Sequence, residues 1–209
     1  MGLFLAALAG GCRVERPDGI SEQEIRKSVF VDGLGRQVLI RKPIERAVSL
    51  APSLTEMIFA VGAGDRLVGV TTYCNYPEAA KAIEKVGDTQ TPNIERIIAL
   101  KPDVVFVSTA SQLEAFMKTL EEQGISVYVT NPANLEGVME NLKTFGNFFG
   151  TEKVADGLIA DLEKRSRMVD EKVKGKQPVK VFVQISNEPL FTIGKESFLT
   201  EILSRAGGG

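Results

Sequence analysis

Ser53, Cys74 and Glu95 are the side chains whose types and positions first suggest chemistry. A serine or cysteine nucleophile needs a neighbouring base, usually histidine, and the 209-residue chain contains no histidine. The same absence removes the commonest protein ligand of zinc and iron. Glu95 has no carboxylate or lysine at a pairing distance along the chain, so it makes a poor catalytic acid. The sequence therefore predicts no catalytic residue and no metal site, with a Cys74 or Ser53 enzyme using a displaced lysine as the alternative.

A second group of residues offers binding instead of catalysis, because its members follow the ends of expected strands. Ligands of open parallel sheets bind at the carboxyl ends of the strands. The loops that follow the expected strands contain one charged residue, Asp88, beside residues with hydroxyl, amide and aromatic groups. Such a set suits a large, partly apolar and neutral ligand. No glycine-rich phosphate loop is present, since the GAGD sequence at 62–65 follows a helix. The candidate ligand-binding residues are Ser53, Tyr73, Thr89, Ser108 and Phe191.

Alternating strand and helix patterns must position these residues. Val104 to Val107 are apolar on both faces, as in parallel strands that lie between helices. The alternation predicts an α/β fold with an open parallel sheet covered on both faces. The expected strands span 46–50, 66–71, 103–108 and 126–130, and the expected helices span 52–64, 76–87, 91–101, 113–124 and 134–150.

Ser53 and Glu95 each have an ordinary structural role at the start of an expected helix. Ser53 with Glu56 three residues later predicts a capping box. Thr91 is expected to cap the next helix, with Pro92 at its first position. Glu95 in that first turn is favoured by the helix dipole by about 0.3–1 kcal/mol, which alone would justify it.

The alternation of short strands and helices stops at residue 152. Residues 152–174 predict one helix about twice the usual length, with its apolar stripe formed by Val154, Leu158, Leu162, Val169 and Val173. One strand at 179–186 and one helix at 198–209 follow, which is too little to bury a core of their own. We expect a signal peptide of lipoprotein type (1–12), a linker (13–28), an N-terminal α/β lobe (29–150), a long connecting helix (151–175) and the start of a C-terminal α/β lobe that is incomplete here (176–209).

The first twelve residues, MGLFLAALAGGC, have the apolar run and small residues of a secretory leader. The apolar run is too short to span a membrane. The pattern resembles a bacterial lipoprotein leader, in which Cys12 becomes the lipidated N-terminus. Cys74 then has no partner for a disulfide bond.

Three segments resemble one protein family: AVSLAPSLTEMIFAVGAGDRLVGVTTYCNYP, PNIERIIALKPDVV and VFVQISNEPLFTIGKESFLTEILSRAGG. They look like the substrate-binding proteins of cobalamin and iron-siderophore ABC importers, and are closest to members that bind vitamin B12. The resemblance covers residues 45–209. It implies two Rossmann-like lobes with parallel sheets, joined by a single long helix, that bind ligand between them.

The resemblance also implies roles for individual residues. Tyr73 and Phe191 match aromatic ligand contacts, whereas Thr89 and Ser108 stand where two tryptophans line the cobalamin cleft. The ligand therefore stays open between cobalamin, another corrinoid, haem and a ferric siderophore, and no resident cofactor is implied. Glu95 matches the glutamate that contacts the membrane permease.

The resulting hypothesis is a binding protein outside the cytoplasm, in the periplasm or at the cell surface, anchored by lipid at Cys12. Its partners would be a permease dimer with its ATPase, a small-molecule ligand and the membrane. The net charge of −2 gives no basic stripe for nucleic acid. A sensor or adhesin that binds the same ligand is the other alternative.

Overall fold

The computed structural model describes residues 26–109 and 114–209. Cys12, the expected signal peptide and most of the expected linker lie outside these residues. The strands are β1 (Arg26–Val31), β2 (Gln37–Lys42), β3 (Ala47–Ser49), β4 (Leu67–Val70), β5 (Val104–Ser108), β6 (Ser126–Thr130), β7 (Gln184–Ser186) and β8 (Phe191–Thr192). The helices are α1 (Pro52–Ala60), α2 (Ile94–Ala99), α3 (Glu114–Glu122), α4 (Leu135–Phe149), α5 (Glu152–Val173) and α6 (Phe198–Arg205), with 3₁₀ turns at Gly64–Arg66 and Glu78–Ala82.

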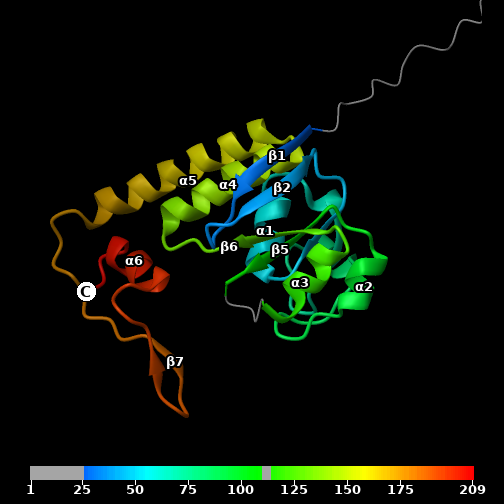
Figure 1. Cartoon of the computed structure of the whole chain (residues 1–209). Coiled ribbons are helices and arrows are strands. Elements are labelled where there is room, and N and C mark those ends of the chain that lie inside the picture. Colours follow the sequence, from blue (N-terminus) through cyan, green and yellow to red (C-terminus); the bar gives the residue numbers. More distant parts are fainter. Residues whose placement is uncertain (1–25, 110–113) are drawn as a thin grey trace, which may run out of the picture.

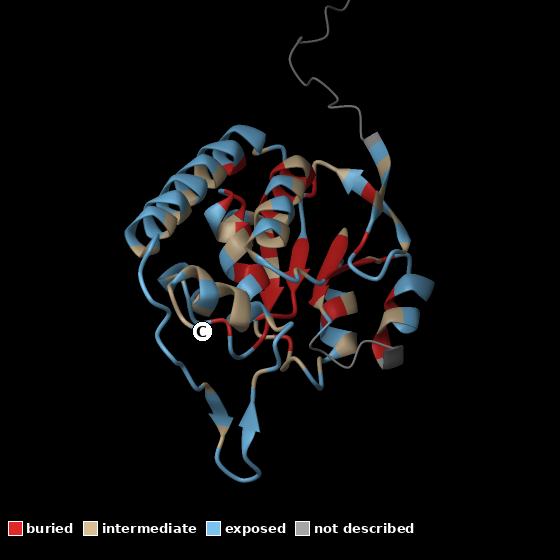
Figure 2. Cartoon of the chain, turned by 90° about the vertical axis from the view of Figure 1, so that its left-hand side faces the viewer, coloured by how far each residue is buried: buried red, intermediate tan, exposed pale blue. Residues whose placement is uncertain are grey.

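A parallel sheet forms the centre of the N-terminal lobe (residues 26–150), as the alternating pattern predicts. Among the described residues it has four strands in the order β4-β3-β5-β6. Val105 and Val107 face the side covered by α2 and α3, where they pack with Ile97 and Leu120. Val104 and Phe106 face α1 and α4. Figure 2 shows this sheet as the buried centre of the molecule.

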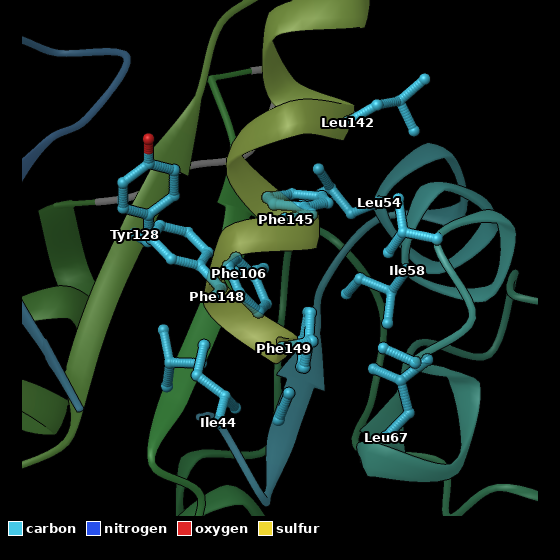
Figure 3. Packing of buried hydrophobic residues seen from close by; sticks show 14 of the residues in the cluster. Ile44, Leu54, Ile58, Leu67, Phe106, Tyr128, Leu142, Phe145, Phe148 and Phe149 are labelled. Carbon is cyan, nitrogen blue, oxygen red and sulfur yellow. The ribbon is translucent and has the colours of Figure 1, made fainter. Parts of the chain in front are cut away.

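An aromatic cluster fills the α1–α4 side of the sheet (Figure 3). The Phe106 ring lies 4.9 Å from the Phe145 ring, and the Tyr128 ring lies 5.0 Å from the Phe148 ring in an edge-to-face arrangement. Such pairs contribute about 0.5–1.5 kcal/mol each beyond the area they bury. Leu54 and Ile58 of α1 complete this core, which fixes the helix that begins at the end of β3.

The β1–β2 hairpin turns at the sequence DGLG (32–35), and β1 begins at Arg26, inside the expected linker. Asp32 is 5% exposed at the turn. It accepts hydrogen bonds from the backbone N–H groups of Leu34 and Arg36 and from the Arg36 guanidinium. Burial alone raises the pKa of Asp32, but these hydrogen bonds and the Arg36 charge outweigh burial and lower it. Arg36 also donates to the Val127 carbonyl, which joins the hairpin to β6.

The expected helix at 76–87 is wrong in extent. Only a 3₁₀ turn forms at Glu78–Ala82, and the chain is extended at Ile83. The Val70 N–H donates to the Glu84 carbonyl, and the Val86 N–H donates to the Val70 carbonyl, because the open edge of β4 offers unpaired backbone groups. The hydrogen bonds to β4 therefore outweigh the local helical preference of residues 83–87.

Both expected helix caps are also wrong. Ala51 is the N-cap of α1 and Pro52 occupies its first turn, so Ser53 lies inside the helix and caps nothing. Asn93 caps α2 by accepting a hydrogen bond from the Arg96 N–H at 2.9 Å. Thr91 instead donates to the Asp88 carboxylate.

The long helix is confirmed as α5, which packs against α4 (Figure 1). A Cβ atom at Gly146 of α4 would lie 2.6 Å from the Ala155 Cβ, so a glycine is needed for this close approach. The packing turns Ala155, Leu158 and Leu162 toward the core. Val154 and Val169, which belong to the expected stripe, are exposed.

Residues 176–209, named here the C-terminal segment, form the β7–β8 hairpin and α6. The expected strand at 179–186 is shorter than predicted, since only Gln184–Ser186 pairs with β8, while Val179 bridges to Gly208. Figure 1 shows the hairpin projecting beyond α6. Phe182 is 68% exposed, in contrast to the buried strands of the main sheet. Within the described residues, no helix combines the length and apolarity needed to cross a bilayer.

Asp32→Asn should lower the free energy of unfolding by about 1–3 kcal/mol at pH 7, because it removes charge-assisted hydrogen bonds from a buried carboxylate. The folded-state pKa of Asp32 is lowered, so this stabilisation is complete above the ordinary aspartate pKa and disappears as the pH falls through the folded-state value. Urea unfolding from pH 7 to pH 3 should show the variant and the parent converging below about pH 4. Asp65→Asn, at a 75% exposed side chain, is the control, and an equal loss there would contradict the assignment.

Candidate functional site

A buried hydrogen-bond network joins the two loops that follow β3 and β4. Thr55 Oγ1 donates to Ser49 Oγ at 2.8 Å and lies 3.2 Å from Cys74 Sγ. Thr71 Oγ1 lies 3.1 Å from the same sulfur. All four side chains are essentially inaccessible to solvent, so the network fixes the start of α1 against the loop at residues 71–77.

Cys74 has a structural role in this network. Its sulfur is surrounded by hydroxyl groups, and the residue is 1% exposed. The Lys85 amine donates to the carbonyl oxygens of Cys74 and Ala80, at 3.0 and 2.9 Å, and is held there. In residues 26–109 and 114–209, no three His, Cys, Asp or Glu side chains gather where they could hold a metal ion. These contacts suit a fixed loop more than a reactive thiol.

A pocket of about 530 Å³ opens beside the strand ends, bounded by α1, α4, α5 and α6. This volume lies within the usual range for small-molecule sites, about 300–1,000 Å³. One wall is apolar and the rim near the strand ends is polar. The lining residues are Ser53, Glu56, Met57, Ala60, Tyr76, Ser108, Thr130, Pro132, Val138, Leu142, Leu158, Leu162 and Phe198.

The α1 part of the pocket follows from helix spacing. Ser53, Glu56, Met57 and Ala60 are three and four residues apart, which places them on one helical face. Because Ala51 and Pro52 form the start of the helix, Ser53 is not used as a cap and lines the pocket with Glu56. Among the described residues, Glu56 is the single charged residue in this lining.

The structure brings together two of the five ligand-binding residues that the sequence predicts. Ser53 and Ser108 line the pocket. Tyr73 and Phe191 are 60% and 58% exposed and do not contribute to its lining, and neither does Thr89. Tyr76 and Phe198 supply the aromatic groups of this pocket instead.

The Asp88 loop explains the position of Thr89. The Asp88 carboxylate accepts hydrogen bonds from the backbone N–H groups of Thr91 and Gln90, at 2.6 and 2.8 Å, and these lower its pKa. Thr89 lies half-buried within the closed loop. Asp88 therefore shapes the loop, and its charge is directed at backbone donors.

Glu95 is exposed in the first turn of α2. In the part of the chain that the structure describes, it has no hydrogen-bond or ion-pair partner, whereas the adjacent Arg96 contacts Glu84 and the Lys85 carbonyl. The Glu95 carboxylate is accessible to an outside partner.

Two polar contacts hold α6 against the N-terminal lobe and the long helix. Glu201 Oε2 accepts a hydrogen bond from the Leu135 N–H at 2.9 Å, so a carboxylate from α6 satisfies the N-terminus of α4. Arg205 donates to both carboxylate oxygens of Asp170 on α5, at 2.8 and 3.3 Å. The Arg205 hydrogen bond lowers the pKa of Asp170. With α6 held at both points, Phe198 in its first turn reaches the pocket.

Sequence reasoning missed Tyr76 and Phe198 because their place in the pocket depends on distant contacts. Phe198 follows the N-cap Ser197, whose side chain accepts from the Thr200 N–H. That cap marks a helix start and gives no sign of what the helix faces. The available signal was the four-residue spacing of the apolar residues Phe198 and Ile202, which places them on one face of the expected helix.

Comparisons with known proteins agree with this architecture. The family model for periplasmic binding proteins matches residues 48–209. An uncharacterized ABC transporter substrate-binding lipoprotein of Bacillus subtilis (strain 168) is 35% identical, over 97% of this chain and 68% of that protein. The vitamin B12-binding protein of Vibrio cholerae is 31% identical over 79% of this chain. The chain spans 60% of that relative's length.

Solved structures show the same fold. The periplasmic vitamin B12 binding protein of Vibrio cholerae superposes with a TM-score of 0.73 at 31% identity, over 80% of this chain and 66% of that chain. A periplasmic heme binding protein from Pseudomonas aeruginosa gives a TM-score of 0.72 at 28% identity, over 79% of this chain and 62% of that chain.

Glu201→Ala should release α6 from α4, because the Leu135 N–H loses its acceptor, at a cost of about 1 kcal/mol. Spin labels placed at exposed Lys143 on α4 and exposed Ser204 on α6 should then show a broader distance distribution than in the parent. Glu196→Ala, at an exposed glutamate just before α6, is the control. An unchanged distribution in the Glu201 variant would show that this hydrogen bond does not position α6.

Proposed function

The chain belongs to the periplasmic binding protein family, and from that premise we propose that it is the solute-binding component of an ABC importer. It binds a corrinoid between the rim of the N-terminal lobe and the C-terminal segment. It then delivers this ligand to a permease dimer driven by its ATPase. The observation that carries the proposal is the pocket at the strand ends, whose lining comes from both parts of the chain within the matched residues.

The character of the pocket supports a bulky ligand with a broad apolar surface. Leu142, Leu158, Leu162 and Phe198 form an apolar wall, while Ser53 and Ser108 add hydroxyl groups at the rim. A corrinoid has an apolar ring surface and a polar, amide-bearing edge, which matches this division. The curated relative at 31% identity that is named for its ligand is a vitamin B12-binding protein, which favours the corrinoid.

Haem or a ferric siderophore is the second candidate ligand. A solved heme binding protein shares the fold with nearly the same TM-score, so the fold does not separate these ligands. The distinction must come from the side chains of the pocket.

The family is a class of solute-binding transport proteins and not a class of enzymes. The buried position of Cys74 and the engaged amine of Lys85 also argue against nucleophilic chemistry at this loop. The protein acts outside the cytoplasm in this proposal, held at the membrane through lipid on Cys12. The relative named as a lipoprotein supports such an anchor.

Glu95 is the proposed contact with the permease. Its carboxylate is exposed and can meet a basic group on the partner. An exposed ion pair contributes only about 0–1 kcal/mol, so it orients a transient encounter more than it tightens it.

Tyr76→Ala should weaken binding of dicyanocobinamide to the full chain by about tenfold, because an aromatic pocket residue is a typical binding hot spot. Tyr73→Ala is the matched control, since it removes the same side chain from the same loop but outside the pocket. Titration calorimetry measures both. A loss in the Tyr73 variant alone would place the ligand elsewhere.

Glu95→Arg should reduce ligand uptake by cells while the dissociation constant of the purified protein stays unchanged. Reversing the charge removes the docking contact without touching the pocket. Glu122→Arg, at an exposed position on α3, is the control. Uptake that survives the Glu95 change would show that this carboxylate is not the docking contact, and uptake that does not depend on this protein at all would favour a sensor or adhesin.

A further inference from the structure

The Glu56 carboxylate gives the pocket an electrostatic character that the hydroxyl and apolar residues lack. It lies on the same face of α1 as Ser53 and Ala60 and is exposed to the pocket space. Across residues 26–109 and 114–209, no lysine or arginine lines this pocket, and Glu56 has no hydrogen-bond or ion-pair partner. Its negative charge is therefore uncompensated by any described neighbour.

The other polar groups of the lining do not discriminate by charge. Ser53 and Ser108 carry hydroxyl groups, which can either donate or accept. Thr130 is 2% exposed and its hydroxyl donates to the Val107 carbonyl. An ionised glutamate only accepts hydrogen bonds. A ligand group opposite Glu56 must therefore supply an N–H or O–H donor, or a positive charge.

A ligand carboxylate beside Glu56 would be repelled. It would face a like charge without a basic side chain to offset the repulsion, and like-charge juxtaposition is how binding sites reject wrong partners. Haem carries propionate groups, and many ferric siderophores are anionic. Corrinoids such as cobinamide carry carboxamide groups, which present N–H donors.

We propose that Glu56 is a specificity-determining residue, which selects a corrinoid with amide side chains against carboxylate-bearing ligands of similar size. This inference rests on the proposed function and names the ligand class of the same pocket. Glu56 acts by contact with the edge of the ligand, while the apolar wall binds the ring.

A pair of ligands with the same ring tests this role. Dicyanocobinamide carries carboxamides, whereas dicyanocobyrinic acid carries carboxylates at the corresponding positions. Calorimetric titration of the full chain should give at least about tenfold tighter binding of the amide form, a ratio that is typical for one unfavourable polar contact. Added salt should narrow the ratio, because it screens an exposed charge.

Variants at position 56 separate charge from shape. Glu56→Gln keeps the size of the side chain and should reduce the ratio about tenfold, mainly by improving binding of the carboxylate form. Glu56→Lys should reverse the preference, which a merely structural role would not do. Glu122→Gln, on the exposed surface of α3, is the control and should leave the ratio unchanged. Circular dichroism confirms that each variant is folded.

The outcomes distinguish the two levels of the proposal. If the parent binds dicyanocobinamide but Glu56→Gln and Glu56→Lys keep its ligand ratio, the role of Glu56 is wrong and the corrinoid function stands. If the parent binds neither corrinoid, the proposed function fails and this inference fails with it. If the parent prefers the carboxylate form, the selection has the opposite sign and the inference is overturned.

Discussion

The hydrogen bonds among Ser49, Thr55, Thr71 and Cys74 hold together the two loops on which the pocket depends. Buried polar groups must find partners, since an unsatisfied one costs about 1–3 kcal/mol. Here Thr55 contacts Ser49 on its own side of the network, and the Cys74 thiol joins Thr55 to Thr71 of the neighbouring loop. These four side chains are engaged with one another and are buried away from a ligand. The network presents instead the exposed face of α1 and the tip of the loop that carries Tyr76.

The opposite wall depends on a different kind of contact. Helix α6 has no buried residues, so it is placed by polar contacts at its middle and its end, through Glu201 and Arg205. The Arg205–Asp170 pair is partly exposed and contributes little stability by itself. Its two-point geometry nevertheless fixes an orientation. The two walls of the pocket are therefore positioned by different contacts, a buried network on one side and partly exposed polar contacts on the other.

Much of the fold could be predicted from the sequence, because the signals are local and repeated. The run from Val104 to Val107 is apolar on both faces, and the parallel central strand follows from that pattern. The length and charged face of residues 152–174 likewise predicted α5. The helix expected at 76–87 could not be rejected in this way. Its replacement depends on the edge of β4 and on carbonyl groups that bind the Lys85 amine, and neither is visible in a sequence window.

The sequence predicts the site residues that follow the strand ends, but it does not predict the aromatic residues of the pocket. Ser53 and Ser108 follow directly from the rule that parallel sheets bind ligands at the carboxyl ends of their strands. Tyr76 and Phe198 belong to the pocket only after the loop and α6 have been placed by distant hydrogen bonds. The spacing of Ser53 and Glu56 predicts a capping box, whereas the helix begins at Pro52 and leaves Glu56 for the pocket.

A crystal structure of the full chain grown with dicyanocobinamide tests the central claim most directly. The account predicts that the corrin ring lies between Ser108 and Phe198, with a carboxamide edge toward α1. A ring bound against the exposed β7–β8 hairpin, with the pocket of α1, α4, α5 and α6 empty, would contradict it.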